Sequence, residues 1–134
     1  LPFHQNRDAA AVLTARVVGQ ESDGLAALDI AGQRLLVAGE AGAPGNAVRV
    51  RIMARDVSLA VEPPSKTTIL NILKAEITAI EALRGSDAAV TLGLGNQTLL
   101  ARITQRSVAA LDLRVGQPVF AQVKGVALVT GPAQ

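Results

Sequence analysis

An internal repeat constrains this chain of 134 residues more than any other feature of its sequence. Three pairs of short segments share residue types at shifts of 60, 64 and 69 positions: 15–18 with 75–78, 33–37 with 97–101, and 57–61 with 126–130. A shift that grows along the chain indicates two copies of one unit whose loops differ in length. Such a repeat has to be identified first, because it determines which folds are possible.

Both units show the pattern of short β-strands. Apolar and polar residues alternate over residues 48–53, which is the period of a half-buried strand. Residues 25–30 and 33–37 predict a hairpin about Ala31-Gly32, because glycine readily adopts the positive φ that tight turns need. The expected strands are 12–18, 25–30, 33–37, 48–53 and 57–61 in the first unit, and 73–82, 88–94, 97–103, 119–123 and 126–130 in the second.

The units differ at one connection. Where the first has a glycine-rich link over residues 38–46, the second has residues 104–111, whose alanine and leucine content favours one or two turns of helix. Ser107 is placed as the N-cap of this helix.

Five short strands in about sixty to seventy residues are typical of small closed Greek-key barrels. The sequence therefore predicts an all-β protein of two tandem OB-like barrels, with a short helix in the second. Residues 1–10 are interpreted as a lead-in from an upstream domain, 11–64 as the first barrel and 65–134 as the second; since no Met begins the chain, we expect it to be part of a longer protein. Barrels this small have marginal cores, so we expect them to pack together.

Composition excludes several classes of function. With no cysteine and one histidine, His4 in the lead-in, a zinc or copper site is not expected. The formal charge is +2 without any block of like charges, and two phenylalanines cannot build a stacking platform, so nucleic-acid binding is disfavoured. The sequence lacks a phosphate loop, a nucleophile elbow and a zinc-protease motif, and Gly93–Asn96 reads as a hairpin turn, so no enzyme is predicted. Apolar runs are too short for a membrane span and no signal peptide is indicated, so we expect a soluble, intracellular protein.

Small hydrogen-bond donors gather in the second unit. They comprise hydroxyls, one amide and one ammonium: Ser65, Thr67, Thr68, Asn71, Thr104, Ser107 and Lys124. Many donors, modest positive charge and a helix start suit a tetrahedral oxyanion. The alternative is that the hydroxyls cap backbone groups and that the lysine is only solvated.

Residues 51–60, 68–73, 103–111 and 119–124 resemble the C-terminal region of molybdate-transporter ATPase subunits. This is the paired molybdate-binding-protein (Mop, or TOBE) domain, and the resemblance extends over the chain from about Ala10. It implies a regulatory domain of two OB-like barrels that binds molybdate or tungstate at interfaces, often between the subunits of a homodimer.

The resemblance also implies roles for individual residues. The Ser-Ala-Arg-Asn type motif of the family falls on Thr68–Asn71, the Thr-x-x-Ser motif on Thr104 and Ser107, and the basic residue on Lys124. The arginine of the first motif is Leu70 here, so one cationic ligand is lost. The first unit has fewer matching donors. It either binds no ligand or contributes Arg55 and Ser58 to a composite site formed with the second unit.

Three functions follow as hypotheses. The first is a cytoplasmic sensor of molybdate or tungstate, attached to the ATPase domain of an importer and, through its membrane subunits, to the inner face of the cell membrane. The second is a structural domain that only dimerises the ATPase. The third is a free molybdate store, or the effector domain of a molybdate-responsive regulator.

Overall fold

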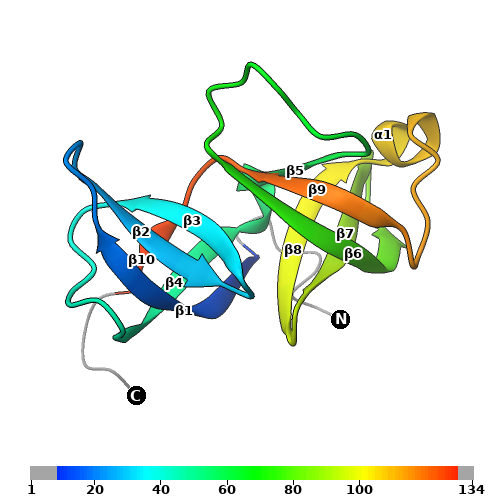
Figure 1. Ribbon diagram of the computed structural model, residues 1–134. Coiled ribbons are helices and arrows are strands. Elements are labelled where there is room, and N and C mark those ends of the chain that lie inside the picture. The colour runs from blue at the N-terminus through cyan, green and yellow to red at the C-terminus, as the bar shows by residue number, and fades with distance from the viewer. Residues whose placement is uncertain (1–8, 130–134) are drawn as a thin grey trace.

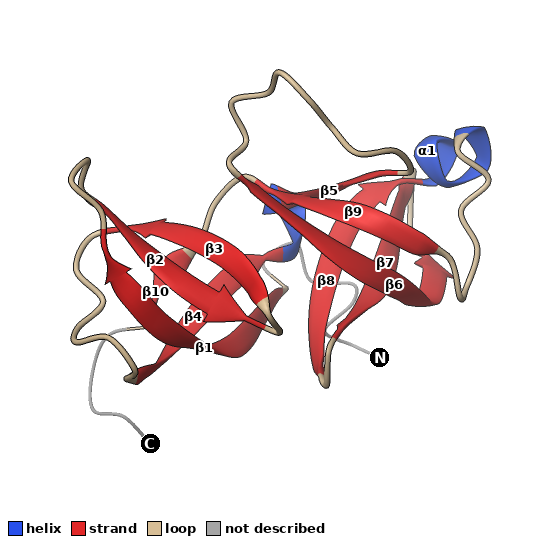
Figure 2. Cartoon of the chain, viewed as in Figure 1, coloured by secondary structure: helices blue, strands red, loops and turns tan. Residues whose placement is uncertain are grey.

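The chain forms two curled, five-stranded antiparallel sheets that lie side by side (Figures 1 and 2). The computed structural model describes residues 9–129. One sheet contains β1 (Ala10–Gln20), β2 (Leu25–Ile30), β3 (Gln33–Ala38), β4 (Ala47–Met53) and β10 (Ala127–Leu128); the other contains β5 (Val57–Ala60), β6 (Asn71–Ala82), β7 (Asp87–Leu94), β8 (Gln97–Thr104) and β9 (Pro118–Val123). A 3-10 turn (Ala54–Asp56) follows β4, and helix α1 (Gln105–Ala110) follows β8. The predicted all-β fold, with its short helix in the second unit, is confirmed.

Strand periodicity accounts for the core. Along β1, Leu13, Ala15 and Val17 are buried, whereas Thr14 and Arg16 between them are exposed. Because residues two apart in a strand share a face, each strand presents one aliphatic row to the interior. The rows of both sheets join in one continuous cluster of valine, leucine, isoleucine and alanine. Arg49 and Arg51 lie on the exposed face of β4, in agreement with the alternation of apolar and polar residues over 48–53.

The repeat is visible in the pairing of the strands. The sheets have the orders β10-β4-β1-β2-β3 and β5-β9-β6-β7-β8. The two orders match position by position, because β1 to β4 correspond to β6 to β9, and β5 corresponds to β10. The β1–β2 ladder shifts register between Val17 and Gly19, and the β6–β7 ladder shifts between Ile77 and Ala79, 60 positions later. The predicted hairpin about Ala31-Gly32 is confirmed, and both of these residues have positive φ.

The two units exchange their fifth strands. β5, which follows β4 in the chain, pairs with β9, so that Leu59 faces Ala121. β10 pairs with β4, so that Leu128 faces Val50. Figure 1 shows the red β10 among the blue strands of the other unit. Each sheet therefore takes four strands from one unit and one from the other, across the boundary proposed between residues 64 and 65.

Three details differ from the sequence-based expectation. The N-cap of α1 is Thr104 and not Ser107, because the Thr104 side chain accepts a hydrogen bond from the Ser107 N–H. β10 has two residues instead of the expected 126–130, and Thr130 lies outside the described residues. β1 begins at Ala10, inside the expected lead-in, while His4 lies outside the described residues. Within residues 9–129, no helix is long and apolar enough to cross a membrane.

Candidate functional site

The two sheets meet along two seams that the repeat relates to each other. In the β3–β6 seam, the Gln33 side chain donates to the Lys74 carbonyl at 2.9 Å and accepts from the Lys74 N–H at 2.8 Å. In the β1–β8 seam, Gln97 makes the same two bonds to Thr14, at 2.9 and 2.8 Å. Each glutamine side chain thus binds the backbone of the other sheet as a neighbouring strand would, and both seams have the same spacing.

Asn71 adds a second bridge to the β3–β6 seam. Its Oδ1 accepts from the Leu36 N–H and its Nδ2 donates to the Leu36 carbonyl, both at 2.8 Å. Asn71 is 8% exposed, and among residues 9–129 no other polar or charged residue is buried. A buried amide has to be hydrogen-bonded, and this one is bound by backbone groups. The side chain that we expected to bind an anion therefore joins the two sheets in the chain as it stands.

Thr104 and Ser107 lie together at the start of α1. The Thr104 hydroxyl donates to Ser107 Oγ at 2.9 Å and accepts from the Ser107 N–H at 3.1 Å. The Ser107 hydroxyl proton then points to no partner within this pair and is available to an acceptor. Gln105 fixes the helix start, because its Nε2 donates to three carbonyls around the β6–β7 connection and its N–H donates to the Ser86 carbonyl.

Lys124 lies where β9 leads into β10. Its N–H donates to the Asp56 carbonyl at 2.8 Å, so the two connections that exchange strands are hydrogen-bonded to each other. Ser58 is the second residue of the neighbouring β5, and its Oγ accepts from the Gln122 side chain at 2.9 Å. Arg55 belongs to the same connection as Asp56, and both Arg55 and Lys124 are exposed. This end of the sheet carries two cationic side chains and a hydroxyl beside one carboxylate.

The donor groups of Thr104–Ser107 and of Lys124 lie at opposite ends of one sheet. Val123, next to Lys124, pairs with Asn71 at the start of β6, whereas Thr104 pairs with Asp87 at the start of β7. Since β6 and β7 are antiparallel, their starts are at opposite ends. Figure 1 shows the same separation, with α1 at one end of the sheet and the end of β9 at the other. One chain does not bring the predicted residues into one pocket.

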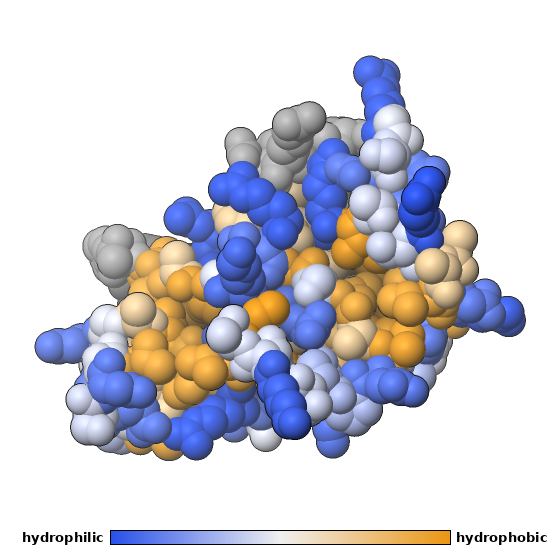
Figure 3. All heavy atoms as spheres, turned by 90° about the horizontal axis from the view of Figure 1, so that it is seen from above, coloured by the Kyte–Doolittle hydropathy of each residue, from blue (hydrophilic) through white to orange (hydrophobic). Residues whose placement is uncertain are grey.

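The connection of residues 61–70 carries the other predicted donors. Ser65, Thr67 and Thr68 are exposed, and Thr67 Oγ1 accepts from the Ile69 N–H at 3.1 Å, which stabilises a local turn. Leu70, the residue that replaces the arginine of the family motif, is 63% exposed next to Asn71. Figure 3 shows the molecule from above, and on the surface seen there orange apolar patches alternate with blue polar side chains.

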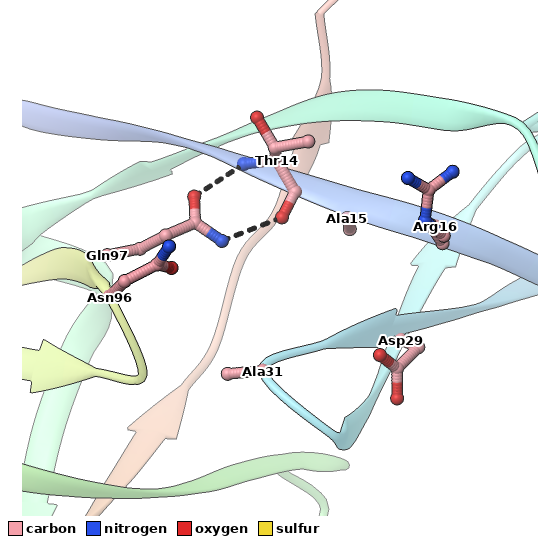
Figure 4. A pocket seen from close by; sticks show the side chains of 7 residues that line it. All are labelled: Thr14, Ala15, Arg16, Asp29, Ala31, Asn96 and Gln97. Carbon is pink, nitrogen blue, oxygen red and sulfur yellow. Dashed lines mark hydrogen bonds between the residues drawn. The ribbon is translucent and has the colours of Figure 1, made fainter.

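Two hollows flank the Gln97–Thr14 bridge and were not predicted from the sequence. One, of about 450 Å³, is an open cleft that Arg16, Asp29 and Asn96 line (Figure 4). The other, of about 320 Å³, lies between Ala11 and Leu100. The signal in the sequence is the recurrence of Gln33 as Gln97 in the repeat, which indicates duplication but does not by itself reveal a contact between the sheets.

A comparison with models of known protein families finds a match in the second unit. Residues 67–129 match the model of the TOBE domain. The TOBE segment contains β6 to β10 but not β5, so one strand of its sheet comes from the preceding unit. The resemblance stated from the sequence is confirmed.

Curated relatives extend the likeness over nearly the whole chain. The chain is 45% identical over 133 residues to the molybdenum import ATP-binding protein ModC of Rhodopseudomonas palustris (strain HaA2), covering 96% of this chain and 35% of that protein. It is 41% identical over 130 residues to ModC of Aromatoleum aromaticum, covering 96% and 34%. The chain therefore spans about a third of the length of these relatives.

Among solved structures, this chain has the fold of ModG, described as a cytoplasmic molybdate-binding protein and solved with molybdate bound. The TM-score is 0.72 with 24% sequence identity, over 88% of this chain and 92% of that one. This likeness confirms the paired Mop/TOBE fold.

Proposed function

We propose that this chain is the oxyanion-binding regulatory region of the ATP-binding subunit of a molybdenum importer, and that its ligand is molybdate or tungstate. The observation that carries the proposal is 41–45% identity to ModC proteins over 96% of the chain. The fold shared with the molybdate-binding protein ModG supports it. The region itself binds and regulates, while the ATPase activity belongs to the part of the relatives that this chain does not span.

The anion site lies between two copies of the chain. Thr104 and Ser107 are at the opposite end of the sheet from Lys124, so a site that uses all three needs the Lys124 end of a second copy. In a twofold dimer the contact is reciprocal, and two equivalent sites result. Exposed aliphatic side chains accompany the donors at each end: Leu70 (63% exposed) near Lys124, and Val115 (65%) after α1. Burying them between copies would remove apolar surface from water.

The donors suit a doubly charged tetrahedral oxyanion. Ser107 Oγ accepts from Thr104, so its own hydroxyl can donate to an anion, and the Lys124 ammonium supplies charge from the other copy. Hydrogen bonds from neutral and cationic donors to an anion are short and strong. Arg55 and Ser58 lie at the same end of the sheet as Lys124, and the Asn71 amide joins the two sheets beside them.

The similarity to ModC proteins also supports a location in the cell. In the full-length protein the region is attached to an ATPase domain, and through the importer's membrane subunits it lies at the cytoplasmic face of the membrane. Binding regulates transport only to the extent that the anion binds two transporter states with different affinity.

Calorimetric titration of the chain with molybdate, tungstate and sulfate tests the ligand. We expect saturable heat with molybdate and tungstate, and a loss of that heat in Lys124→Ala and in Ser107→Ala. Absence of heat with all three anions refutes anion binding itself.

A mixture of the two variants tests the placement between copies. If each site takes Ser107 from one copy and Lys124 from the other, random mixing of Lys124→Ala and Ser107→Ala chains restores about a quarter of the wild-type sites, because half of the dimers have one intact site. No recovery on mixing, in variants that still dimerise, refutes the shared site and leaves anion binding untouched.

A purely structural dimerisation domain is the second candidate. Leu70, an exposed aliphatic residue where the family motif has arginine, favours it. Size-exclusion chromatography separates the two functions: this candidate requires a stable dimer without any anion, and titration heat with none.

A further inference from the structure

The β1–β8 seam contains an unfilled counterpart of the slot that the Asn71 amide occupies in the β3–β6 seam. The repeat relates Ala11 to Asn71 at a shift of 60 and Leu100 to Leu36 at a shift of 64. Both seams are held at the same spacing by their glutamine bridges, whose four hydrogen bonds are 2.8–2.9 Å long. Where one seam has a carboxamide, the other has the methyl group of alanine.

The backbone of Leu100 is oriented as that of Leu36 is. Leu36 faces Ala27 in the fourth pair from the β2–β3 turn, and Leu100 faces Thr91 in the fourth pair from the β7–β8 turn. Pairs in an antiparallel ladder alternate between those that exchange hydrogen bonds and those that do not. Since the Leu36 N–H and carbonyl point out of their hairpin to Asn71, the Leu100 N–H and carbonyl point out to Ala11.

Space is present where this amide would lie. A hollow of about 320 Å³ lies between Ala11 and Leu100, with Ala10, Val12 and Thr98 also on its wall and Gln97 at one side. Within residues 9–129, no side chain binds the outward N–H or carbonyl of Leu100. The site therefore offers one donor and one acceptor side by side, framed by aliphatic groups.

We propose that this slot binds a small molecule that ends in a primary carboxamide. The chain supplies its own template, because the Asn71 carboxamide makes both bonds to the equivalent backbone at 2.8 Å. A carboxylate of the same shape can accept from the Leu100 N–H but cannot donate to the carbonyl, which it would repel. The slot consequently distinguishes an amide from an acid, by about tenfold if one hydrogen bond is lost.

Nuclear magnetic resonance of the ¹⁵N-labelled chain tests the slot. Acetamide and L-glutamine are expected to shift the Leu100 amide resonance in a saturable way, while acetate and L-glutamate at the same concentrations leave it nearly unchanged. Ala11→Asn fills the slot from within, so its Leu100 resonance should already be displaced and should no longer respond. Molybdate titration of Ala11→Asn separates this proposal from the proposed function, because anion binding should be unaffected.

Asn71→Ala provides the matched control, because it opens the equivalent slot and should make the Leu36 resonance respond to acetamide. A response of Leu36 in that variant, with no response of Leu100 in the wild-type chain, overturns the proposal. So does a Leu100 response of the same size in wild type and in Ala11→Asn. If Asn71→Ala does not fold, the comparison between wild type and Ala11→Asn decides alone: a response in the first only supports the slot, and any other pattern refutes it.

Discussion

Replacing Asn71 with alanine isolates the contribution of one amide to the joint between the sheets. The side chain is 8% exposed and makes two hydrogen bonds of 2.8 Å, both to the backbone of Leu36 in the other sheet. The substitution leaves the aliphatic core unchanged. It also reproduces, in the β3–β6 seam, the arrangement that the β1–β8 seam already has at Ala11, so we expect the variant to fold.

The expected cost follows from those two bonds. A hydrogen bond within a protein contributes about 0.5–1.5 kcal/mol net, so two contribute about 1–3 kcal/mol. Leu36 is half-buried, so water reaches its freed backbone groups in part, and we expect the middle of that range, about 2 kcal/mol. For a domain of this size, 1 kcal/mol corresponds to about 4 °C, so the melting temperature should fall by about 8 °C.

Urea denaturation followed by circular dichroism measures the loss. We expect a lower midpoint at an unchanged m-value, because the surface exposed on unfolding stays the same. Asn46→Ala is the control, since this exposed loop residue should change stability by less than about 0.5 kcal/mol. If Asn71→Ala is as stable as Asn46→Ala, the amide bridge does not hold the seam and the reasoning is wrong.

Three further predictions concern other substitutions. Asn71→Asp should be most destabilising at neutral pH, because burial and the facing Leu36 carbonyl raise the folded-state pKa of the new carboxyl above its unfolded value. The loss of unfolding free energy relative to wild type therefore shrinks as pH falls and grows as pH rises through the folded pKa. Urea midpoints at acid and neutral pH measure this difference. Thr104→Val should cost about 1 kcal/mol of unfolding free energy through the lost helix cap, whereas Thr104→Ser should keep most of it, as thermal melts will show. Gln33→Ala and Gln97→Ala should destabilise by similar amounts in paired denaturation curves, because their bridges are equivalent; a large inequality contradicts the symmetry of the seams.

Features that depend on neighbours in sequence were predictable. The hairpin about Ala31-Gly32 follows from strand periodicity and a turn residue, and both are local. The cap of α1 was misassigned because Thr104 and Ser107 are both good N-caps, and the choice depends on where β8 ends. The exchange of fifth strands was not predictable. Since Leu59 and Leu128 occupy equivalent positions of the repeat, either strand fits either sheet by its pattern, and only the path of the connections decides.

In the candidate site, too, contacts between sequence neighbours were predictable and contacts set by the strand order were not. The sequence identified the hydroxyls that meet at α1, because Thr104 and Ser107 are three residues apart. It did not reveal that Lys124 lies at the other end of the sheet, because that distance depends on strand order. From the sequence, Asn71 was only one of several candidate anion donors. Its partner Leu36 lies in the other unit, and no local pattern links the two.

Because the two units exchange strands, the proposed anion site lies next to connections that enter both sheets. The two crossing connections bind each other, because the Lys124 N–H donates to the Asp56 carbonyl, and they are close enough that a Cβ at Gly125 would lie 3.0 Å from an Asp56 carboxylate oxygen. Each connection carries the fifth strand of the opposite sheet, so neither sheet can separate from the other without losing a strand. An anion held by the Lys124 side chain would therefore act on the joint itself. Any movement of that joint would displace β5 in one sheet and β10 in the other at once, because both strands are continuous with it.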